Sequence, residues 1–318
     1  MATPKKRSGI GRQIEHPLHP DDQFLVEQKE AYYSNFDWDE YRARRDRYWK
    51  LDLSRSDVDA PAEVRHVIQA GNDQTALTSF SWHAWYPGEI HLWRTRKVSR
   101  EKAYQGYWVE DLWEPPPRKS IPGRFNHAGE PLLYACLDDP WAAIREARVA
   151  GRGDIFIVMK YALVGGELRV KRIGVPHPDS NLRWGHRAIE YEISMFIEAA
   201  IRAPAGDHGP DTYGFTRELL HEFYPLAGGQ EEGWMYESVQ VPQAWNLALP
   251  PNVAHRLLEL RGVVVGVVAE EDNGGLDFRV EMPDWTDSVT PLNGGRIGFP
   301  TFKPELKPGQ TPLDVLPD

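Results

Sequence analysis

The apolar residues in the first part of the chain recur at helical spacing. A helix-start signal at Pro20–Asp22 predicts a helix that runs through Tyr33. A second helix is predicted from Trp38 to Trp49, in a region rich in Arg, Asp, Glu and Tyr. This spacing indicates a helical extension that packs on a larger domain.

Short apolar or alternating segments dominate the rest of the chain and predict strands. These are Glu89–Lys97, Leu132–Leu137, Ile155–Tyr161, Leu168–Ile173, Trp234–Val241 and Val263–Val268. The last is expected to turn at residues 273–275 into an antiparallel partner that ends near Met282. Helices are expected after Leu137, over 188–202 and over 212–224. Asp138 or Asp139 can cap the first of these, and Pro140 suits its first position. The mixture predicts an α+β fold, a mixed sheet with flanking helices.

Proline and glycine mark the expected boundaries. The segment from Trp108 to Gly123 contains Pro115–Pro117 and Pro122, so it is expected to lack regular structure. Pro87 and Gly88 separate the helical extension from the first strand. We therefore predict an extension over 1–88, a core domain over 89–282 and an irregular tail over 283–318.

Composition and charge narrow the possible partners. The chain has 318 residues and a net charge of -10, which opposes general binding to nucleic acid. The basic run Lys5–Arg7 is shorter than a typical nucleic-acid patch. No apolar run follows it, so no signal peptide or membrane helix is expected, and we predict a cytoplasmic protein with no membrane partner. The single Cys136 excludes an internal disulfide and a cysteine-based zinc finger.

Common cofactor motifs are not found in the sequence. There is no glycine-rich phosphate loop in a strand–helix context and no HExxH-type helix. The histidines are scattered, and His16 and His19 lie in a proline-containing segment without further ligands. We therefore expect no metal.

Glu146 lies on the apolar face of the helix predicted after Leu137. A step of about 100° per residue places it among Ala142, Ala143 and Val149. A carboxylate on such a face is costly without a partner, so it has either a buried partner or a function. Periodicity alone favours a hydrogen bond to a nearby arginine.

The stretch GRFNHAGEPLLYACLDDPWAAIREA, from Gly123 to Ala147, resembles the signature of the RES domain family. The family takes its name from an arginine, a glutamate and a serine. The glutamate corresponds to Glu146. The arginine is expected on the opening strand, where HLWRTR supplies Arg94, with Arg96 as a competitor.

The serine is expected late in the chain, in a strand that follows a helix. Ser238 meets this expectation and precedes the segment Asn246–Leu249 that the resemblance leads one to expect. Glu237 departs from the pattern, because related sequences more often carry proline or a small residue there. The resemblance covers roughly residues 89–270, and the chain is longer than a minimal RES toxin.

The resemblance implies a fold similar to the ADP-ribosyltransferases and cleavage of the bond between nicotinamide and ribose in NAD. Glu146 would then stabilise the positive charge that develops on the ribose. Arg94 and Arg124 are the candidates for holding the pyrophosphate or an attacking phosphate, and Ser238 would bind the ribose or the nicotinamide amide. Tyr134 would stack against nicotinamide or ribose, and Asn126 is a further NAD-binding candidate.

Three hypotheses remain open at this point. The first is a RES-type toxin that depletes NAD by phosphorolysis or hydrolysis and is held inactive by an antitoxin. The second is an enzyme that transfers ADP-ribose to a protein. The third is a non-catalytic RES-derived module whose aromatic-rich extension binds a partner; the presence of Arg94, Glu146 and Ser238 argues against it.

Overall fold

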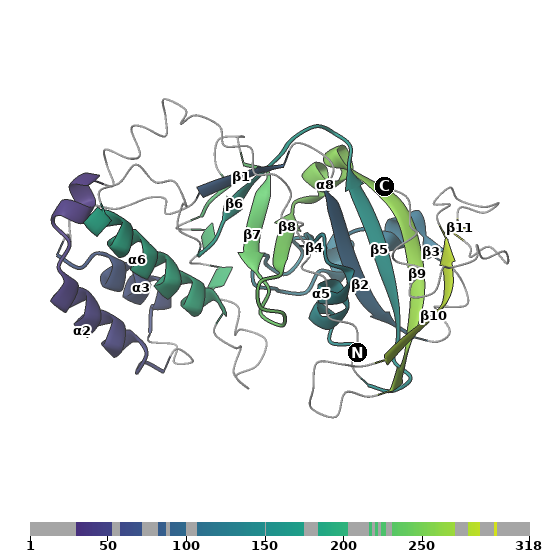
Figure 1. Ribbon diagram of the computed structural model, residues 1–318, viewed down its shortest axis with the longest axis horizontal. Helices are drawn as coiled ribbons and strands as arrows, with labels where there is room; N and C mark the ends of the chain where they lie inside the picture. The colour runs from purple at the N-terminus through teal and green to yellow at the C-terminus, as the bar shows by residue number, and fades with distance from the viewer. Residues whose placement is uncertain are drawn as a thin grey trace, which may run out of the picture.

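The fold combines helices with one large mixed sheet, which confirms the predicted α+β class (Figure 1). The computed structural model describes residues 30–52, 58–71, 82–86, 90–99, 107–149, 151–174, 184–202, 216–217, 220–221, 224–226, 231–270, 279–286 and 296–297. The likeness to ADP-ribosyltransferases stays a prediction. No helix in the described part of the chain is long and apolar enough to cross a membrane.

The large sheet has nine strands. In spatial order they are β1 (Trp82–Tyr86), β6 (Leu168–Arg172), β7 (Gly233–Glu237), β8 (Trp245–Leu249), β4 (Leu133–Leu137), β2 (His91–Val98), β5 (Ile155–Leu163), β9 (Leu258–Glu270) and β10 (Arg279–Thr286). All neighbours are antiparallel except β6 and β7, which are parallel. A separate pair joins β3 (Tyr107–Trp108) to β11 (Arg296–Ile297).

Strands β2 and β4 are paired over a short stretch only. Both lie wholly within the described residues, and their register joins Leu92 to Leu137 and Trp93 to Cys136. On its other side, β2 pairs with β5 along its full length. The sheet therefore opens between β2 and β4 beyond Trp93, and this opening positions the candidate site.

A short helix, α5 (Pro140–Glu146), follows β4 and lies in front of β2 and β4 (Figure 1). The Asp139 carboxylate accepts hydrogen bonds from the backbone N–H groups of Trp141 and Ala142, at 2.9 and 3.0 Å. Pro140 occupies the first turn, where a backbone donor is not needed. Asp139 is thus the N-cap of α5. Of the two predicted cap residues, Asp138 and Asp139, the structure uses the second.

Three helices gather at the β1 end of the sheet (Figure 1). They are α2 (Trp38–Tyr48), α3 (Ala60–Ile68) and α6 (Trp184–Arg202). Their aromatic and aliphatic side chains share one core cluster with β7 and β8; this cluster includes Tyr41, Val64, Phe196 and Trp234. The predicted extension therefore packs on the rest of the protein, and the division into extension, core domain and tail stays a prediction.

Several predicted elements need correction. Helix α3 and strand β1 were not predicted, and β1 places part of residues 1–88 in the sheet. The proline-containing loop holds two short 3-10 helices, η1 (Val109–Leu112) and η2 (Pro117–Lys119). The fixed φ of Pro117 suits the first turn of η2, whereas η1 contains no proline. β10 continues to Thr286 and β11 lies beyond it, so the region after Pro283 is not wholly irregular.

Other predicted elements agree or fall outside the described part. The predicted β10 is antiparallel to β9, as expected. The strand predicted over Trp234–Val241 ends at Glu237. Of the helix predicted over 212–224, residues 216–217 and 220–221 are helical; of the first predicted helix, residues 30–34 are helical. The remainder of that first helix lies outside the described residues.

Candidate active site

A cavity of about 270 Å³ lies where β2 and β4 separate. It is lined by Trp93, Arg94, Thr95, Tyr134, Ala135, Cys136, Ala143, Glu146, Ala147, Tyr236 and Asn246. Three of the six predicted site residues, Arg94, Tyr134 and Glu146, thus share one cavity. The other three, Arg124, Asn126 and Ser238, are not among its lining residues.

Strand register explains which side chains reach this cavity. Cross-strand partners point to the same face of a sheet, and the register links Trp93, Cys136, Asn246 and Tyr236 in one row. Alternation then places Arg94 on the opposite face. Arg94 still lines the cavity because the two strands have separated at that point, so the site draws on both faces of the sheet.

Glu146 is the last residue of α5, and two side chains donate hydrogen bonds to its carboxylate. Its Oε1 accepts a hydrogen bond from the Ser238 hydroxyl and another from Asn246 Nδ2, the latter at 2.8 Å. Asn246 Oδ1 in turn accepts from the Cys136 thiol at 2.9 Å. In the described part of the chain no arginine pairs with this carboxylate, so the buried partner expected from periodicity is a serine and an asparagine instead.

Ser238 is fully buried and lies directly after β7. Its hydroxyl oxygen accepts from the backbone N–H groups of Gln240 and Val241, at 3.2 and 2.8 Å, while its proton goes to Glu146. The structure thus gives this hydroxyl a bond to Glu146 that the sequence did not predict. A bond from Ser238 to ribose or nicotinamide stays a prediction.

Glu237, the acidic residue that departs from the family pattern just before Ser238, has a structural role. Glu237 Oε1 accepts from the backbone N–H of Gln243 at 2.6 Å, which helps close the turn between β7 and β8. Ser238 N–H donates to the carbonyl of Ala244 at 2.8 Å across the same turn. Glu237 therefore helps to fix the placement of Ser238.

We predict that Ser238→Ala lowers the free energy of unfolding by about 1–3 kcal/mol. The change leaves two backbone donors and a carboxylate oxygen without this partner in a buried place. Urea denaturation measures the effect. Ser34→Ala is the matched control, because the Ser34 hydroxyl makes an exposed bond to the carbonyl of Glu30. Equal stability of Ser238→Ala and the wild type would contradict the assigned role.

The two arginines of β2 have different surroundings. The Arg96 guanidinium donates to the carbonyl oxygens of Asp111 and Trp113 and so fixes the loop around η1. Arg94 lines the cavity, and its buried Nη1 has no hydrogen-bond partner in the part of the chain that the structure describes. Burial, together with the charge of Arg96, lowers the pKa of Arg94 to about 9. The structure thus favours Arg94 over Arg96 as the anion-binding group.

Tyr134 presents its ring to the cavity while its hydroxyl is held by the loop before β4. The hydroxyl donates to Asn126 Oδ1 at 2.8 Å and accepts from the backbone N–H of Phe125 at 3.3 Å. Burial raises the pKa of Tyr134, and the bond from Phe125 and the charges of Arg94 and Arg124 oppose that rise.

Asn126 and Arg124 do not line the cavity. The buried Asn126 amide donates to Ser120 Oγ, to the Ile121 carbonyl and to the His127 carbonyl, so its side chain organises the loop. A Cβ on Gly123 would lie 2.5 Å from Asn126 Oδ1, so the glycine makes room for this amide. Arg124 Nη1 donates to the carbonyl of Ile201 at the end of α6.

Sequence reasoning missed the role of Asn246 and the lining residues Trp93, Cys136 and Tyr236. A polar Asn246 within the apolar segment WNLAL was a visible signal, and the two-residue period places Cys136 beside Tyr134. Their meeting with Glu146 depends on strand order, which the sequence pattern does not contain.

The chain also matches a known protein-family model. The model of the RES domain matches residues 91–261, more than half of the chain. No curated protein and no solved structure matches it. The matched region contains β2, α5 and the turn after β7, which carry Arg94, Glu146 and Ser238. The chain belongs to the RES domain family.

Proposed function

We propose that the chain cleaves the bond between nicotinamide and ribose in NAD, by phosphorolysis or hydrolysis. The observation that carries this proposal is the Glu146 carboxylate, which lines the cavity while Ser238 and Asn246 hold its Oε1. Departure of neutral nicotinamide leaves an oxocarbenium-like ribose. A fixed carboxylate beside it stabilises the developing positive charge.

Arg94 supports the same proposal through its unsatisfied guanidinium. A buried cation without a hydrogen-bond partner at Nη1 carries a desolvation cost that an anion in the cavity relieves. Arginine binds phosphate oxygens with planar, bidentate hydrogen bonds. In this proposal Arg94 holds the pyrophosphate of NAD or the attacking phosphate.

The size of the cavity indicates which part of NAD it holds. About 270 Å³ lies just below the roughly 300–1,000 Å³ typical of sites for drug-sized ligands. It suits the nicotinamide and its ribose rather than the whole dinucleotide. The rings of Trp93 and Tyr134 in its lining offer stacking surfaces to nicotinamide.

We predict that Tyr134→Phe keeps most activity, whereas Tyr134→Ala lowers kcat/KM roughly 2- to 10-fold. The hydroxyl already bonds Asn126 and Phe125, so the ring is what the substrate meets. Loss of an aromatic contact worth about 0.5–1.5 kcal/mol gives that range. Steady-state kinetics with NAD measures it. A large loss in Tyr134→Phe would show instead that the hydroxyl itself meets the substrate.

Nicotinamide release from NAD by the purified chain, with and without phosphate, tests the proposed reaction. In phosphorolysis a phosphate oxygen bonds the ribose carbon as the bond to nicotinamide breaks, and in hydrolysis water does so. The first gives a phosphorylated ADP-ribose and requires phosphate; the second gives ADP-ribose without it. ADP-ribose attached to a protein would identify transfer. Failure to release nicotinamide under every condition would overturn the proposal.

In the cell, this reaction would make the chain a toxin that depletes NAD. Expression of the wild-type chain in the cytoplasm should lower NAD and stop growth, and Glu146→Gln should do neither. We further propose that an inhibitory partner protein blocks the cavity. With a net charge of -10 the chain suits a basic partner.

A further inference from the structure

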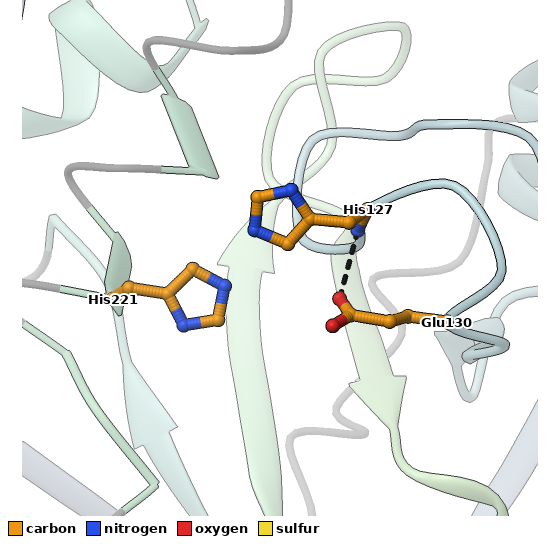
Figure 2. Close-up of side chains that lie close together, drawn as sticks. All are labelled: His127, Glu130 and His221. Atoms are coloured by element: carbon orange, nitrogen blue, oxygen red, sulfur yellow. Dashed lines mark hydrogen bonds between the residues drawn. The ribbon is translucent and has the colours of Figure 1, made fainter.

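His127, Glu130 and His221 form a second cluster of reactive side chains, outside the cavity. One ligand atom from each lies within 4.8 Å of the others, and all three residues are exposed. Figure 2 shows the three side chains directed toward a common space. We infer that these residues bind one divalent transition-metal ion of the zinc class. This inference goes beyond the proposed function and does not rest on it.

The ligand set decides the class of ion. Two imidazoles with one carboxylate form a three-residue set that proteins use to bind zinc while a further position stays open to water. Imidazole nitrogen favours zinc, copper, nickel or iron, whereas magnesium and calcium prefer oxygen ligands. Because all three residues are exposed, water can complete the coordination shell.

Two of the ligands lie on one constrained turn. The Glu130 N–H donates to the His127 carbonyl at 3.1 Å, and Gly129 has the positive φ of 84° that a non-glycine residue rarely adopts. The His127 N–H donates to Glu130 Oε2 at 2.9 Å, which turns the carboxylate toward the histidine (Figure 2). Asn126 fixes the turn further through its bond to the His127 carbonyl. This turn presents His127 and Glu130 together.

The third ligand comes from a distant segment that packs against this loop. Thr216 and Leu220 are buried, and Arg217 Nη1 donates to the carbonyl of Gly123 at 3.2 Å. His221 follows in the same segment, and its ring stacks on that of His127 with centroids 5.4 Å apart and planes at 14°. Packing of this segment therefore brings the second imidazole to the turn.

Side-chain rotations close the site. Zinc–nitrogen bonds of about 2.0–2.1 Å place tetrahedral ligand atoms about 3.3 Å apart. The present separations of up to 4.8 Å thus need to shrink by about 1.5 Å at most. Exposed histidine and glutamate side chains rotate without disturbing the core. The acidic protein, with its net charge of -10, also favours cation binding.

Metal titration of the full chain, prepared without a histidine tag, tests the inference. We expect one equivalent of Zn²⁺ by calorimetry, visible absorption from Co²⁺ bound in its place, and a rise in Tm with Zn²⁺. His127→Ala, His221→Ala and Glu130→Gln should each weaken binding at least about 10-fold, a loss seen even when an outer-shell partner of a metal ligand is removed.

His66→Ala is the matched control, since His66 is exposed on α3 and belongs to another surface. It should bind Zn²⁺ like the wild type. Absence of stoichiometric binding, or an unchanged affinity in both His127→Ala and His221→Ala, would overturn the inference. Circular dichroism of each variant separates loss of the site from loss of the fold. Because these three side chains are exposed, their removal should leave the fold intact.

Discussion

Replacing Glu146 by glutamine is expected to lower the turnover of NAD by about two to four orders of magnitude, the span for a well-placed acid–base group. The amide keeps an oxygen that accepts from Ser238 and Asn246, so the position of the side chain is preserved. It loses the negative charge that stabilises the oxocarbenium-like ribose. The expected loss therefore lies in kcat, with KM nearly unchanged.

Nicotinamide release under saturating NAD measures this effect. Glu110→Gln, on the exposed surface of η1, is the control for removal of one negative charge. Equal melting temperatures of the wild type and Glu146→Gln would show that the fold is intact. If Glu146→Gln were as active as the wild type, the assignment of Glu146 as the catalytic carboxylate would fall.

Replacing Arg94 by methionine is expected to lower kcat/KM for NAD by roughly 10- to 150-fold for each charge-assisted bond lost, at about 1.5–3 kcal/mol per bond. The buried Nη1 has no hydrogen-bond partner among the described residues, so the bonds expected of it are those to the bound anion. Methionine keeps an unbranched apolar stem as far as the position of the arginine Nε and lacks the guanidinium. The variant thus removes the charge and keeps the packing of the stem.

The same substitution is expected to raise Tm, which separates a binding role from a structural one. Burial lowers the pKa of Arg94 to about 9, so at neutral pH the group is charged at a cost to the fold. That cost is fully present below pH 9 and shrinks as the pH rises above it. Removal of the charge therefore stabilises the protein at neutral pH.

Arg118→Met is the matched control for this pair of effects, because Arg118 is an exposed arginine on η2. Its kcat/KM and Tm should stay near the wild-type values. A fall in Tm for Arg94→Met would show that Arg94 stabilises the fold. An unchanged kcat/KM would remove Arg94 from the substrate site.

Local sequence signals predicted most of the sheet and the helix that carries Glu146. Two-residue alternation and apolar runs reveal strands such as β2, β4 and β5, because side chains in a strand alternate between faces. Asp139 and Pro140 predicted the start of α5 through the hydrogen bonds a helix end needs. Strand β1 and helix α3 were missed, although α3 has the same start signal as α5, an aspartate cap at Asp59 followed by a proline in the first turn.

The tertiary structure decided how the candidate site is assembled. Ser238 and Asn246 lie 92 and 100 residues from Glu146 along the chain, and strand order brings them to the same carboxylate oxygen. The gap between β2 and β4 gives Arg94 access to the cavity, while the loop carbonyls engage Arg96. Neither arrangement leaves a local pattern in the sequence.

The sequence by itself determined the family and the α+β class, because these follow from motif order and from the periods of helix and strand. It also grouped Glu146 with Ala142 and Ala143, but α5 ends at Glu146, so Val149 lies beyond the helix on which it was placed. Only the tertiary structure decided that Ser238 bonds the Glu146 carboxylate and that Arg94 Nη1 is buried without a partner among the described residues. The physical reason is that these properties are contacts between distant segments. Backbone periodicity describes each segment alone, whereas packing decides which segments meet.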